Sequence, residues 1–462
     1  ELLAQNLSLL KVREQGQQVK AVALEPTNSL EGQFLAQLPF APTNAQSRVV
    51  SEIKADLQNA YPMMRLVQGD VGCGKTSVAI TTGLITTLNE FQCALMCPTE
   101  SLARQHFNEI KTYSDKLEIS CALLLGSTPA KEKKSILSDL ASGRLSFIVG
   151  THSLFQESVK FHNLGLAIID EQHKFGVEQR IKLVNKTDGC HCLLMTATPI
   201  PRSLSLTQYG DLEISTIKSM PGGRKGSKTR IVSPENFGNF LNFINTRVEM
   251  SEQVYIVVPA ITESPNQDML NLEEVLKRFH NFFPKIRIEG MHGQMKPDEK
   301  KVIFESFSEN KIDILIATSL IEVGINVTNA TVMAIMNPER FGLSSLHQLR
   351  GRVGRGEKPG FCFLVVENQI SKESMERLKV IELNNDGFHI AEEDLKIRGA
   401  GDIFGKDQSG SFTGKKIANI ILNHKELEAA RSDIAEITEM DSSFLENKIK
   451  RMEKDAKIFS TV

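Results

Sequence analysis

The stretch Leu66–Ala79, LVQGDVGCGKTSVA, places a glycine-rich turn between a short apolar run and a segment of helix-forming residues. Glycines let the backbone turn so that its N–H groups face an anion, and a helix directly after the turn adds the positive end of its dipole. In this pattern the Lys75 ammonium reaches the β- and γ-phosphates of a nucleotide, and the Thr76 hydroxyl holds Mg²⁺. The stretch therefore predicts a nucleotide-binding loop made of Gly69, Asp70, Gly72, Gly74, Lys75 and Thr76.

Length and composition are those of a soluble protein with several domains. The chain has 462 residues, of which 41% are apolar and 24% charged, and its formal net charge is −2. The length suggests roughly three domains. Because no global basic field exists, any nucleic-acid binding has to come from a locally positive surface. The seven cysteines form no CxxC pair, so a metal site made of them is not expected. No signal peptide and no membrane-spanning apolar run is visible, which predicts a cytoplasmic protein.

Between Met64 and about Ile217, strand-like apolar runs alternate with segments that have helical spacing. The strand candidates are RLVQ, CALMCP, ALLLG, FIVG, LAIID and CLLMTAT, and the helix candidates between them are Thr76–Asn89, Glu100–Tyr113 and Ala130–Ala141. This alternation is typical of a parallel α/β sheet with helices on both faces, whose ligands bind beyond the carboxyl ends of the strands. A further helix is expected before the first strand, with Gln46 at its start, upstream of the phosphate loop in sequence; a solvated polar side chain is one interpretation of this residue.

Four short polar motifs come after strand candidates of this half: PTE at Pro98–Glu100, GTH at Gly150–His152, DEQH at Asp170–His173 and TATP at Thr196–Pro199. In DEQH, the Asp170 carboxylate suits a Mg²⁺ ligand, and the Glu171 carboxylate suits a group that orients or deprotonates an attacking water. A solvated acidic turn is the alternative, but the phosphate loop in the same sheet favours the Mg²⁺ site. The threonine hydroxyls of TATP either relay the nucleotide state or cap the next helix.

The alternation repeats from Thr229 to about Val366, after a stretch, GRKGSK, that we interpret as a solvated hinge. The strand candidates are TRIVS, QVYIVV, IRIEG, DILIAT, TVMAIM and FCFLVV, and the helix candidates are Phe237–Arg247, Leu272–Phe283 and Pro297–Phe307. This half has no GKT sequence. It has HQLRGRVGRG, in which Arg350, Arg352 and Arg355 have a spacing that suits arginine fingers facing a triphosphate on the first half. A solvated basic loop is the alternative.

Both ends of the chain are predicted to be mainly helical. ELLAQNLSLLKVREQ at the start suits one helix, with a loop after it up to about Ser29. After Val366 a helical segment, SKESMERLKVIELNND, precedes the glycine-dense DGFHIAEEDLKIRGAGDIFGKDQSG. We expect two packed helices and then a mobile loop interrupted by Gly399, Gly401, Gly405 and Gly410, with terminal helices over residues 415–462.

Taken in order, these motifs resemble those of superfamily 2 helicases, and closely those of the RecG family of DNA repair helicases. GDVGCGKT resembles motif I, PTESLARQH motif Ia, DEQHKFGVEQR motif II, TATPIPR motif III, IATSLIEVGINV motif V and QLRGRVGRG motif VI. The glycine-dense segment resembles the translocation (TRG) element that RecG shares with the transcription-repair translocase Mfd. The extension KFGVEQR after DEQH, together with DGFHIAEEDLKIRGAG, is nearer to RecG than to Mfd.

The resemblance implies an α/β fold with two RecA-like parallel-sheet domains in tandem and a C-terminal helical translocation element. It divides the chain into a helical connector (1–40), RecA-like domain 1 (41–222), RecA-like domain 2 (223–370) and a helical hairpin with the TRG-like loop and C-terminal helices (371–462). It implies ATP and Mg²⁺ as cofactors and movement on branched duplex DNA, namely forks and Holliday junctions, in recombination and repair. It further implies a cytoplasmic, nucleoid-associated monomer with a contact to single-strand-binding protein and none to a membrane.

The resemblance also assigns functions to single residues of this sequence. Lys75 and Thr76 bind phosphate and Mg²⁺, Asp170 and Glu171 hold Mg²⁺ and activate water, and the γ-phosphate faces Arg352 and Arg355. Gln46 reads adenine, and Gly324 also contacts the nucleotide. The residues assigned to DNA are Pro98, Thr99, Gly150, Thr151, His152 and Thr318, and those assigned to coupling are Thr196, Thr198, Gln348, Arg398 and Gln408. Contacts directed at the DNA backbone imply selectivity for shape rather than for bases.

Four positions depart from the usual family pattern: Cys73 for Ser, Lys174 for Arg, Asn326 for Asp and Met336 for Glu. Cys73 contributes its backbone, so little loss is expected, and Lys174 keeps the charge without the planar fork of Arg. Asn326 and Met336 bear on coupling rather than on the fold. RecG proteins also carry an OB-fold wedge that grips the branch point, and this chain starts just after the place where the wedge would end. Fork recognition is therefore not carried over.

Two other functions stay open beside the RecG-type motor. The shared TRG element allows an Mfd-like translocase that acts on RNA polymerase. The expected lack of a wedge and the changes at motif V allow a nucleotide-switched DNA-binding scaffold without productive turnover. DNA-stimulated ATP hydrolysis separates the motor from the scaffold, and binding of polymerase separates the two motors.

Overall fold

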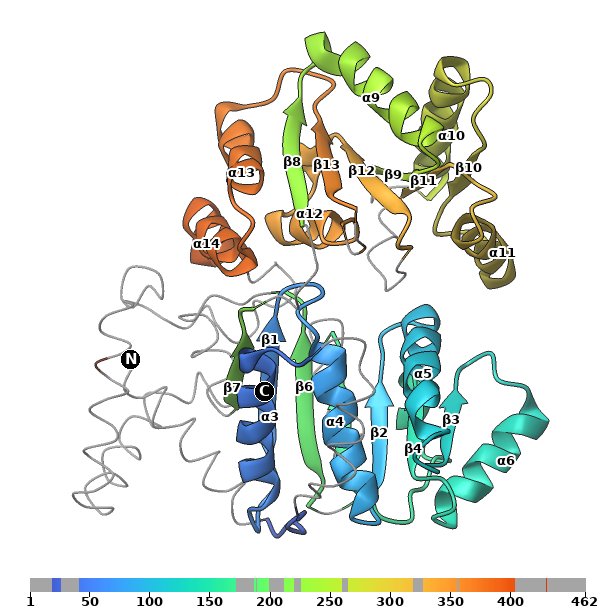
Figure 1. Ribbon diagram of the computed structural model, residues 1–462, viewed down its shortest axis with the longest axis vertical. Coiled ribbons are helices and arrows are strands. Elements are labelled where there is room, and N and C mark those ends of the chain that lie inside the picture. Colours follow the sequence, from blue (N-terminus) through green and yellow to red (C-terminus); the bar gives the residue numbers. More distant parts are fainter. Residues whose placement is uncertain are drawn as a thin grey trace.

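The computed structural model describes residues 19–25, 41–171, 187, 189–198, 212–219, 226–259, 265–318, 327–354, 356, 358–403 and 429. These residues form two α/β domains arranged one after the other along the long axis of the molecule (Figure 1). The first has a seven-stranded sheet in the order β3-β4-β2-β5-β6-β1-β7, and the second has a six-stranded sheet in the order β10-β11-β9-β12-β13-β8. Neighbouring strands of both sheets run parallel. The predicted fold class of two parallel-sheet domains in tandem is confirmed.

The first sheet contains every strand predicted for this half and one more. Its strands are β1 (Met64–Gly69), β2 (Gln92–Met96), β3 (Cys121–Leu124), β4 (Phe147–Gly150), β5 (Leu164–Ile169), β6 (His191–Thr196) and β7 (Glu213–Ile217). The surrounding helices are α3 (Asn44–Leu57), α4 (Lys75–Leu88), α5 (Glu100–Ser114), α6 (Ala130–Ala141) and the short turn η1 (His152–Phe155). Strand β7 was not predicted, because this edge strand is only half-buried and lacks the continuous apolar run of the central strands.

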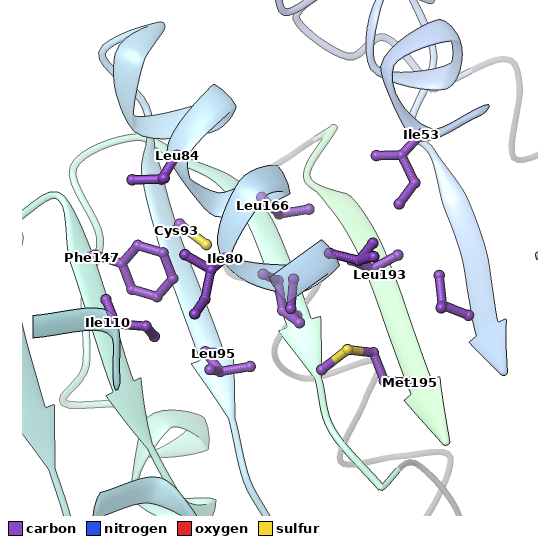
Figure 2. Close-up of a cluster of buried hydrophobic side chains, with 14 of the residues drawn as sticks. Ile53, Ile80, Leu84, Cys93, Leu95, Ile110, Phe147, Leu166, Leu193 and Met195 are labelled. Carbon is purple, nitrogen blue, oxygen red and sulfur yellow. The ribbon is translucent and has the colours of Figure 1, made fainter. Parts of the chain in front are cut away.

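The core of the first domain lies on both faces of the sheet, because successive strand residues point to opposite sides. On one face, α3, α4 and α5 pack on side chains such as Leu95, Leu166 and Leu193 (Figure 2). On the other, α6 packs over alternate residues such as Met96 and Leu194. Mid-helix Gly83 allows the close approach of α4, because a Cβ there would lie 2.3 Å from the Phe147 ring.

The second domain repeats this plan. Its strands are β8 (Ser227–Val232), β9 (Gln253–Val258), β10 (Ile288–Met291), β11 (Ile314–Thr318), β12 (Ala330–Met336) and β13 (Gly360–Val365). Its helices and turns are η3 (Pro234–Asn236), α9 (Phe237–Glu249), α10 (Pro265–Phe282), α11 (Pro297–Ser308), η5 (Pro338–Arg340) and α12 (Leu343–Arg350). All six strands and three helices predicted for this half are present. No helix in the described part of the chain is both long and apolar enough to cross a membrane.

Two packed helices come after the second sheet, as predicted: α13 (Lys372–Leu383) and α14 (Gly387–Ile403). The predicted loop is wrong for its first glycines, because α14 continues through Gly399 and Gly401. Good helix formers in AEEDLKIR offset the cost of a glycine in a helix, which is about 1 kcal/mol each. Gly405, Gly410, the predicted terminal helices and the predicted helix at the start of the chain lie outside the described residues. Residues 19–25 run without a helix beside the end of α3, where the Leu24 N–H donates to the Leu57 carbonyl at 2.8 Å.

Candidate nucleotide-binding site

The phosphate loop connects the end of β1 to the start of α4. Gly72 and Gly74 have φ values of 82° and 90°, a left-handed conformation that favours glycine. A Cβ on Gly74 would also lie 1.9 Å from the Gln46 amide nitrogen. Two glycines of the loop are therefore required by backbone conformation, and one of them by space as well.

Lys75 is the first residue of α4, and its side chain turns back over the loop. Its Nζ donates to the carbonyls of Gly69 at 2.7 Å and Asp70 at 2.9 Å. The ammonium group is thus held at the carboxyl end of β1, next to the N-terminus of a helix, where an anionic phosphate is favoured.

Gln46, a residue of α3, forms a hydrogen bond with the phosphate loop. Its carbonyl oxygen accepts from the Thr43 N–H at 2.7 Å in the cap of α3, and its amide donates to the Cys73 carbonyl at 2.9 Å. Only 2% of the residue is exposed, so the alternative of a solvated side chain is wrong. The assignment of Gln46 to adenine stays a prediction.

Asp170 directly follows β5, and both of its carboxylate oxygens have partners. Oδ1 accepts from the Glu171 N–H at 2.9 Å, and Oδ2 lies 2.8 Å from Nε2 of His106 on α5. Burial raises the pKa of Asp170, but the hydrogen bond and charge of His106, together with Lys75, lower the pKa below its ordinary value. Conversely, burial lowers the pKa of His106, and Asp170 raises it above the ordinary value. Sequence reasoning did not single out His106, because one histidine in an apolar helix stripe carries no signal of its partner.

Glu171 connects the DEQH and TATP motifs. Its Oε2 accepts from the Ala197 N–H at 3.3 Å, and its backbone is left-handed with φ 49°. At the end of β6, the hydroxyls of Thr196 and Thr198 lie 2.7 Å apart, and the Thr198 N–H donates to the Thr196 hydroxyl at 3.2 Å. The two motifs meet because β5 and β6 are neighbours and end at the same edge of the sheet.

The donor set fits Mg²⁺ that is carried by a nucleotide. The Asp170 carboxylate and the Thr76 hydroxyl are hard oxygen ligands, and Lys75 is near enough to Asp170 to lower its pKa. Among the described residues there is no cluster of three or more His, Cys, Asp or Glu residues that could hold a metal by itself. Mg²⁺ usually takes one or two protein oxygens and completes its shell with phosphates and water.

The second domain touches the phosphate loop through α12, which faces the end of β1 in Figure 1. His347 Nε2 forms a hydrogen bond with the Asp70 carboxylate, and a Cβ on Gly351 would lie 2.9 Å from the Val71 Cβ. Burial raises the pKa of Asp70, but the hydrogen bond and charge of His347, with the charge of Lys75, lower the pKa below its ordinary value. A second contact between the domains places Lys218 Nζ 5.9 Å from the centre of the Phe388 ring.

Arg350 does not face the nucleotide loop, which corrects the expectation for the first arginine of HQLRGRVGRG. Its guanidinium donates to His347 Nδ1 at 2.6 Å and to the carbonyls of Ile381 at 2.8 Å and Asn384 at 2.6 Å. A guanidinium only donates, so Nδ1 accepts and His347 Nε2 carries the hydrogen donated to Asp70. The spacing of the arginines could not reveal this, because the carbonyls belong to the last turn of α13 and the residue after it.

The other sequence-predicted residues of the second domain are only partly described. Arg352 and Gln348 are buried near the end of α12. Arg398 belongs to α14. Three assigned residues lie outside the described part of the chain: Gly324, Arg355 and Gln408.

The residues assigned to DNA lie at or just beyond the carboxyl ends of strands. Thr99 caps α5 after β2, with its hydroxyl 3.4 Å from the Leu102 N–H, and both Thr99 and Pro98 are half-buried. Gly150 and Thr151 at the end of β4 are buried, and His152 beside them is exposed. Thr318 at the end of β11 is buried. Their contact with DNA stays a prediction.

Comparisons with known proteins first define the class. Residues 43–206 match the DEAD/DEAH box helicase family, and residues 236–357 match the helicase conserved C-terminal domain, so each sheet belongs to a helicase-type domain. Residues 384–457 match a third family model, ATP-dependent DNA helicase RecG, domain 3, C-terminal.

Relatives define the family. The chain is 45% identical over 414 residues to the ATP-dependent DNA helicase RecG of Bacillus subtilis, covering 89% of this chain and 60% of the relative. It is 42% identical over 465 residues to RecG of Haemophilus influenzae, covering 100% of this chain and 67% of the relative. The structure of RecG bound to a three-way DNA junction matches with a TM-score of 0.76 and 41% identity, over 93% of this chain and 56% of that chain. The chain belongs to the RecG family of ATP-dependent DNA helicases, and it spans 60% of the Bacillus subtilis relative.

Proposed function

We propose that this chain is an ATP-driven motor that moves on branched duplex DNA and thereby regresses forks and migrates Holliday junctions in recombination and repair. Membership of the RecG family supports the activity. The observation that carries the mechanism is the hydrogen bond between Asp70 in the phosphate loop and His347 in the second domain. Through this contact, one domain can respond to the ligand bound by the loop of the other domain.

In this proposal the first domain supplies most of the nucleotide chemistry. Lys75 neutralises phosphate charge, Thr76 and Asp170 hold Mg²⁺, and Glu171 orients or deprotonates the attacking water. When bound with ATP, Mg²⁺ neutralises charge that develops on the phosphates. Two features of the fold support these assignments: Lys75 is held over the loop by two carbonyls, and Glu171 is held by the Ala197 N–H. Arg352 and Arg355 are proposed to face the γ-phosphate, with Gln46 and Gly324 as further nucleotide contacts.

Coupling to movement is proposed to run from Asp70 through His347 and Arg350 to the connection between α13 and α14. Each step is a hydrogen bond between buried or half-buried groups, which is stronger than the same bond in water. A shift of α12 relative to the phosphate loop would therefore move the end of α13. We include a further set of coupling residues in this proposal: Thr196, Thr198, Gln348, Arg398 and Gln408.

The proposed DNA contacts lie along the carboxyl ends of both sheets. They comprise Pro98, Thr99, Gly150, Thr151, His152 and Thr318. Contacts of this kind are directed at the DNA backbone and carry little base information, so we expect the motor to select the shape of DNA. We also propose that it acts as a monomer in the cytoplasm, associated with the nucleoid and in contact with single-strand-binding protein.

The test is the rate of ATP hydrolysis by the purified chain on forked, duplex and single-stranded DNA, combined with migration of a labelled Holliday junction. We expect the rate of ATP hydrolysis to rise with duplex or forked DNA. Branch migration should separate the junction into duplex products only when ATP is present. Tight ATP binding without turnover on any DNA would contradict the motor and favour a nucleotide-switched scaffold. ATP-dependent displacement of RNA polymerase, without junction migration, would instead favour an Mfd-like translocase.

A further inference from the structure

Helix α5 buries a histidine in the middle of its apolar face. The buried residues of α5 are Leu102, Ala103, His106, Ile110 and Ser114. Their spacing of three and four residues is that of a helix face packed on a core, where leucine or alanine is the usual residue. His106 is only 3% exposed, so a polar group has been taken from water at this position. Such a group is costly unless it has a partner.

The partner of His106 is the carboxylate proposed to hold Mg²⁺. We propose that His106 is a positioning residue for ATP hydrolysis: its Nε2 fixes the orientation of the Asp170 carboxylate and joins that carboxylate to α5. The inference rests on the proposed function, because it deepens the assignment of Asp170. It also makes α5 the element through which DNA bound at the strand ends acts on the nucleotide.

The backbone of Asp170 is already fixed, so only its side chain is free to rotate. The Asp170 N–H donates to the Met96 carbonyl at 2.9 Å, which extends the pairing of β5 with β2. An ionised carboxylate only accepts hydrogen bonds, so His106 Nε2 carries the hydrogen of the 2.8 Å bond to Oδ2. Together with the Glu171 N–H on Oδ1, this bond holds both oxygens and leaves their other lone pairs for a cation.

The N-terminal end of the same helix is anchored beside the proposed DNA contacts. Thr99 caps α5, and the Glu100 carboxylate accepts from the Ser127 hydroxyl at 2.7 Å and from the Ser127 N–H at 3.2 Å. His106 comes seven residues after Thr99, which is roughly 10 Å along a helix axis. A rigid helix of this length transmits a displacement at its first turn to Asp170.

A second buried histidine of the same domain provides a matched control. At the start of β6, His191 Nδ1 accepts from the Met63 N–H at 3.0 Å, and Nε2 lies 3.0 Å from the Val22 carbonyl. Both ring nitrogens of His191 therefore form hydrogen bonds with backbone groups, at the end of the sheet opposite the phosphate loop. His106 differs, because its Nε2 meets the carboxylate and its Nδ1 has no hydrogen-bond partner among the described residues.

The experiment compares the parent chain with His106→Leu, His106→Gln and His191→Leu. Leu fills the apolar space without a donor, and the Gln amide can replace the Nε2–H. The first readout is the affinity for a fluorescent ADP analogue in Mg²⁺ and in EDTA. The second is the Mg²⁺ concentration needed for half-maximal hydrolysis, with and without forked DNA. A thermal unfolding curve of each variant reports the fold.

We expect His106→Leu to lose about 10- to 100-fold of the affinity gained from Mg²⁺ and most of the stimulation by DNA, with affinity in EDTA unchanged. His106→Gln should recover most of both losses, whereas His191→Leu should lower the unfolding temperature without changing either readout. The inference is overturned if His106→Leu keeps the Mg²⁺ dependence of the parent, or if His106→Gln behaves as His106→Leu does. If the parent itself hydrolyses no ATP, the proposed function fails, and the ADP measurement still decides the role of His106.

Discussion

Strands β2 and β9 occupy corresponding places in the two sheets, and each begins with a buried glutamine. The Gln92 amide donates to the carbonyls of Leu140 and Leu145, both at 2.8 Å, at the end of α6 and just before β4. The Gln253 amide makes the same pair of bonds, at 2.6 and 2.7 Å, to carbonyls at the end of α11 and just before β11. In each domain, one glutamine side chain thus connects the end of a helix, α6 or α11, to the sheet.

The pairing of the central strands is also repeated. The ladder of β2 with β5 shifts register directly after Gln92, and the ladder of β9 with β12 shifts directly after Gln253. Counting on from these shifts, Asp170 corresponds to Met336 and Glu171 to Asn337. Both second residues are left-handed, with φ values of 49° and 46°. Asparagine tolerates this conformation far better than glutamate, so the first domain carries backbone strain where the second does not.

The domains differ in the loops and helices beyond their strands rather than in the strands themselves. Strand β1 leads into the glycine turn of the phosphate loop, whereas β8 leads through η3 into α9 without such a turn. Strand β5 ends in the acidic pair, whereas β12 leads to α12, whose His347 binds the phosphate loop. The repeated scaffold therefore differs in its connections, because loops can change without altering the sheet. The first domain has the glycine turn and the acidic pair, and the second has the histidine that contacts the phosphate loop.

The largest effect is expected from removing the Lys75 charge of the phosphate loop, which only the first domain has. Lys75→Ala should reduce DNA-stimulated kcat roughly 100- to 1000-fold, because a preorganised cation at the phosphates is lost. Asn236→Ala, at the corresponding strand-to-helix connection of the second domain, should leave kcat within about twofold. Steady-state ATP hydrolysis measures both, and equal losses in the two variants would contradict an asymmetric motor.

The shared glutamines should matter in both domains, and more in the first, where Gln92 Oε1 also accepts from the N–H groups of His162 at 2.8 Å and Asn163 at 3.0 Å. Gln92→Leu and Gln253→Leu should each lower the free energy of unfolding by about 2–4 kcal/mol, because each leaves two carbonyls without their amide donor. Urea unfolding measures the loss, with the exposed Gln58→Leu as a control expected to change stability by less than about 0.5 kcal/mol. A large loss in only one domain would mean that the two bonds are not equivalent.

The contact between the two domains can be measured with a double-mutant cycle of Asp70→Ala and His347→Ala. We expect a coupling free energy of about 1.5–3 kcal/mol, because the hydrogen bond involves a charged group that is largely buried. Denaturant unfolding of the two single variants and the double variant gives this value. Lys218→Ala removes the contact of Lys218 with the Phe388 ring and should cost only about 0.5–1 kcal/mol. Additive losses in the cycle would exclude a direct interaction between Asp70 and His347.

The smallest effect concerns the left-handed residues. Asn337→Glu should lower the free energy of unfolding by about 1 kcal/mol, because glutamate fits this conformation less well. Glu171→Asn should raise it by about 0.5 kcal/mol, since the relieved strain is partly offset by loss of the 3.3 Å bond to Ala197. Thermal unfolding of both variants checks the opposite signs. Two changes of the same sign would show that strain is not the property that distinguishes the positions.

Much of the fold was predictable, because buried parallel strands are continuous apolar runs and the helices between them have helical spacing. Strand β7 and the helical course of α14 through two glycines were not predictable, since an edge strand and a tolerated glycine contradict those local rules. In the site, the phosphate loop and the acidic pair were visible as motifs. His106 in the site was not, and neither were Gln92 and Gln253 in the sheets, because a buried polar residue gives no local sign of its partner.

By itself, the sequence determined the two sheets, the phosphate loop with Lys75, and the acidic pair at Asp170 and Glu171. These depend on neighbouring residues, whose apolar spacing and glycine turns set the local backbone. Only the tertiary structure decided that Asp170 meets His106, 64 residues away, and that Asp70 meets His347, 277 residues away. Such contacts depend on the order of strands in a sheet and on how two domains meet, and neither is encoded in any short stretch of the chain.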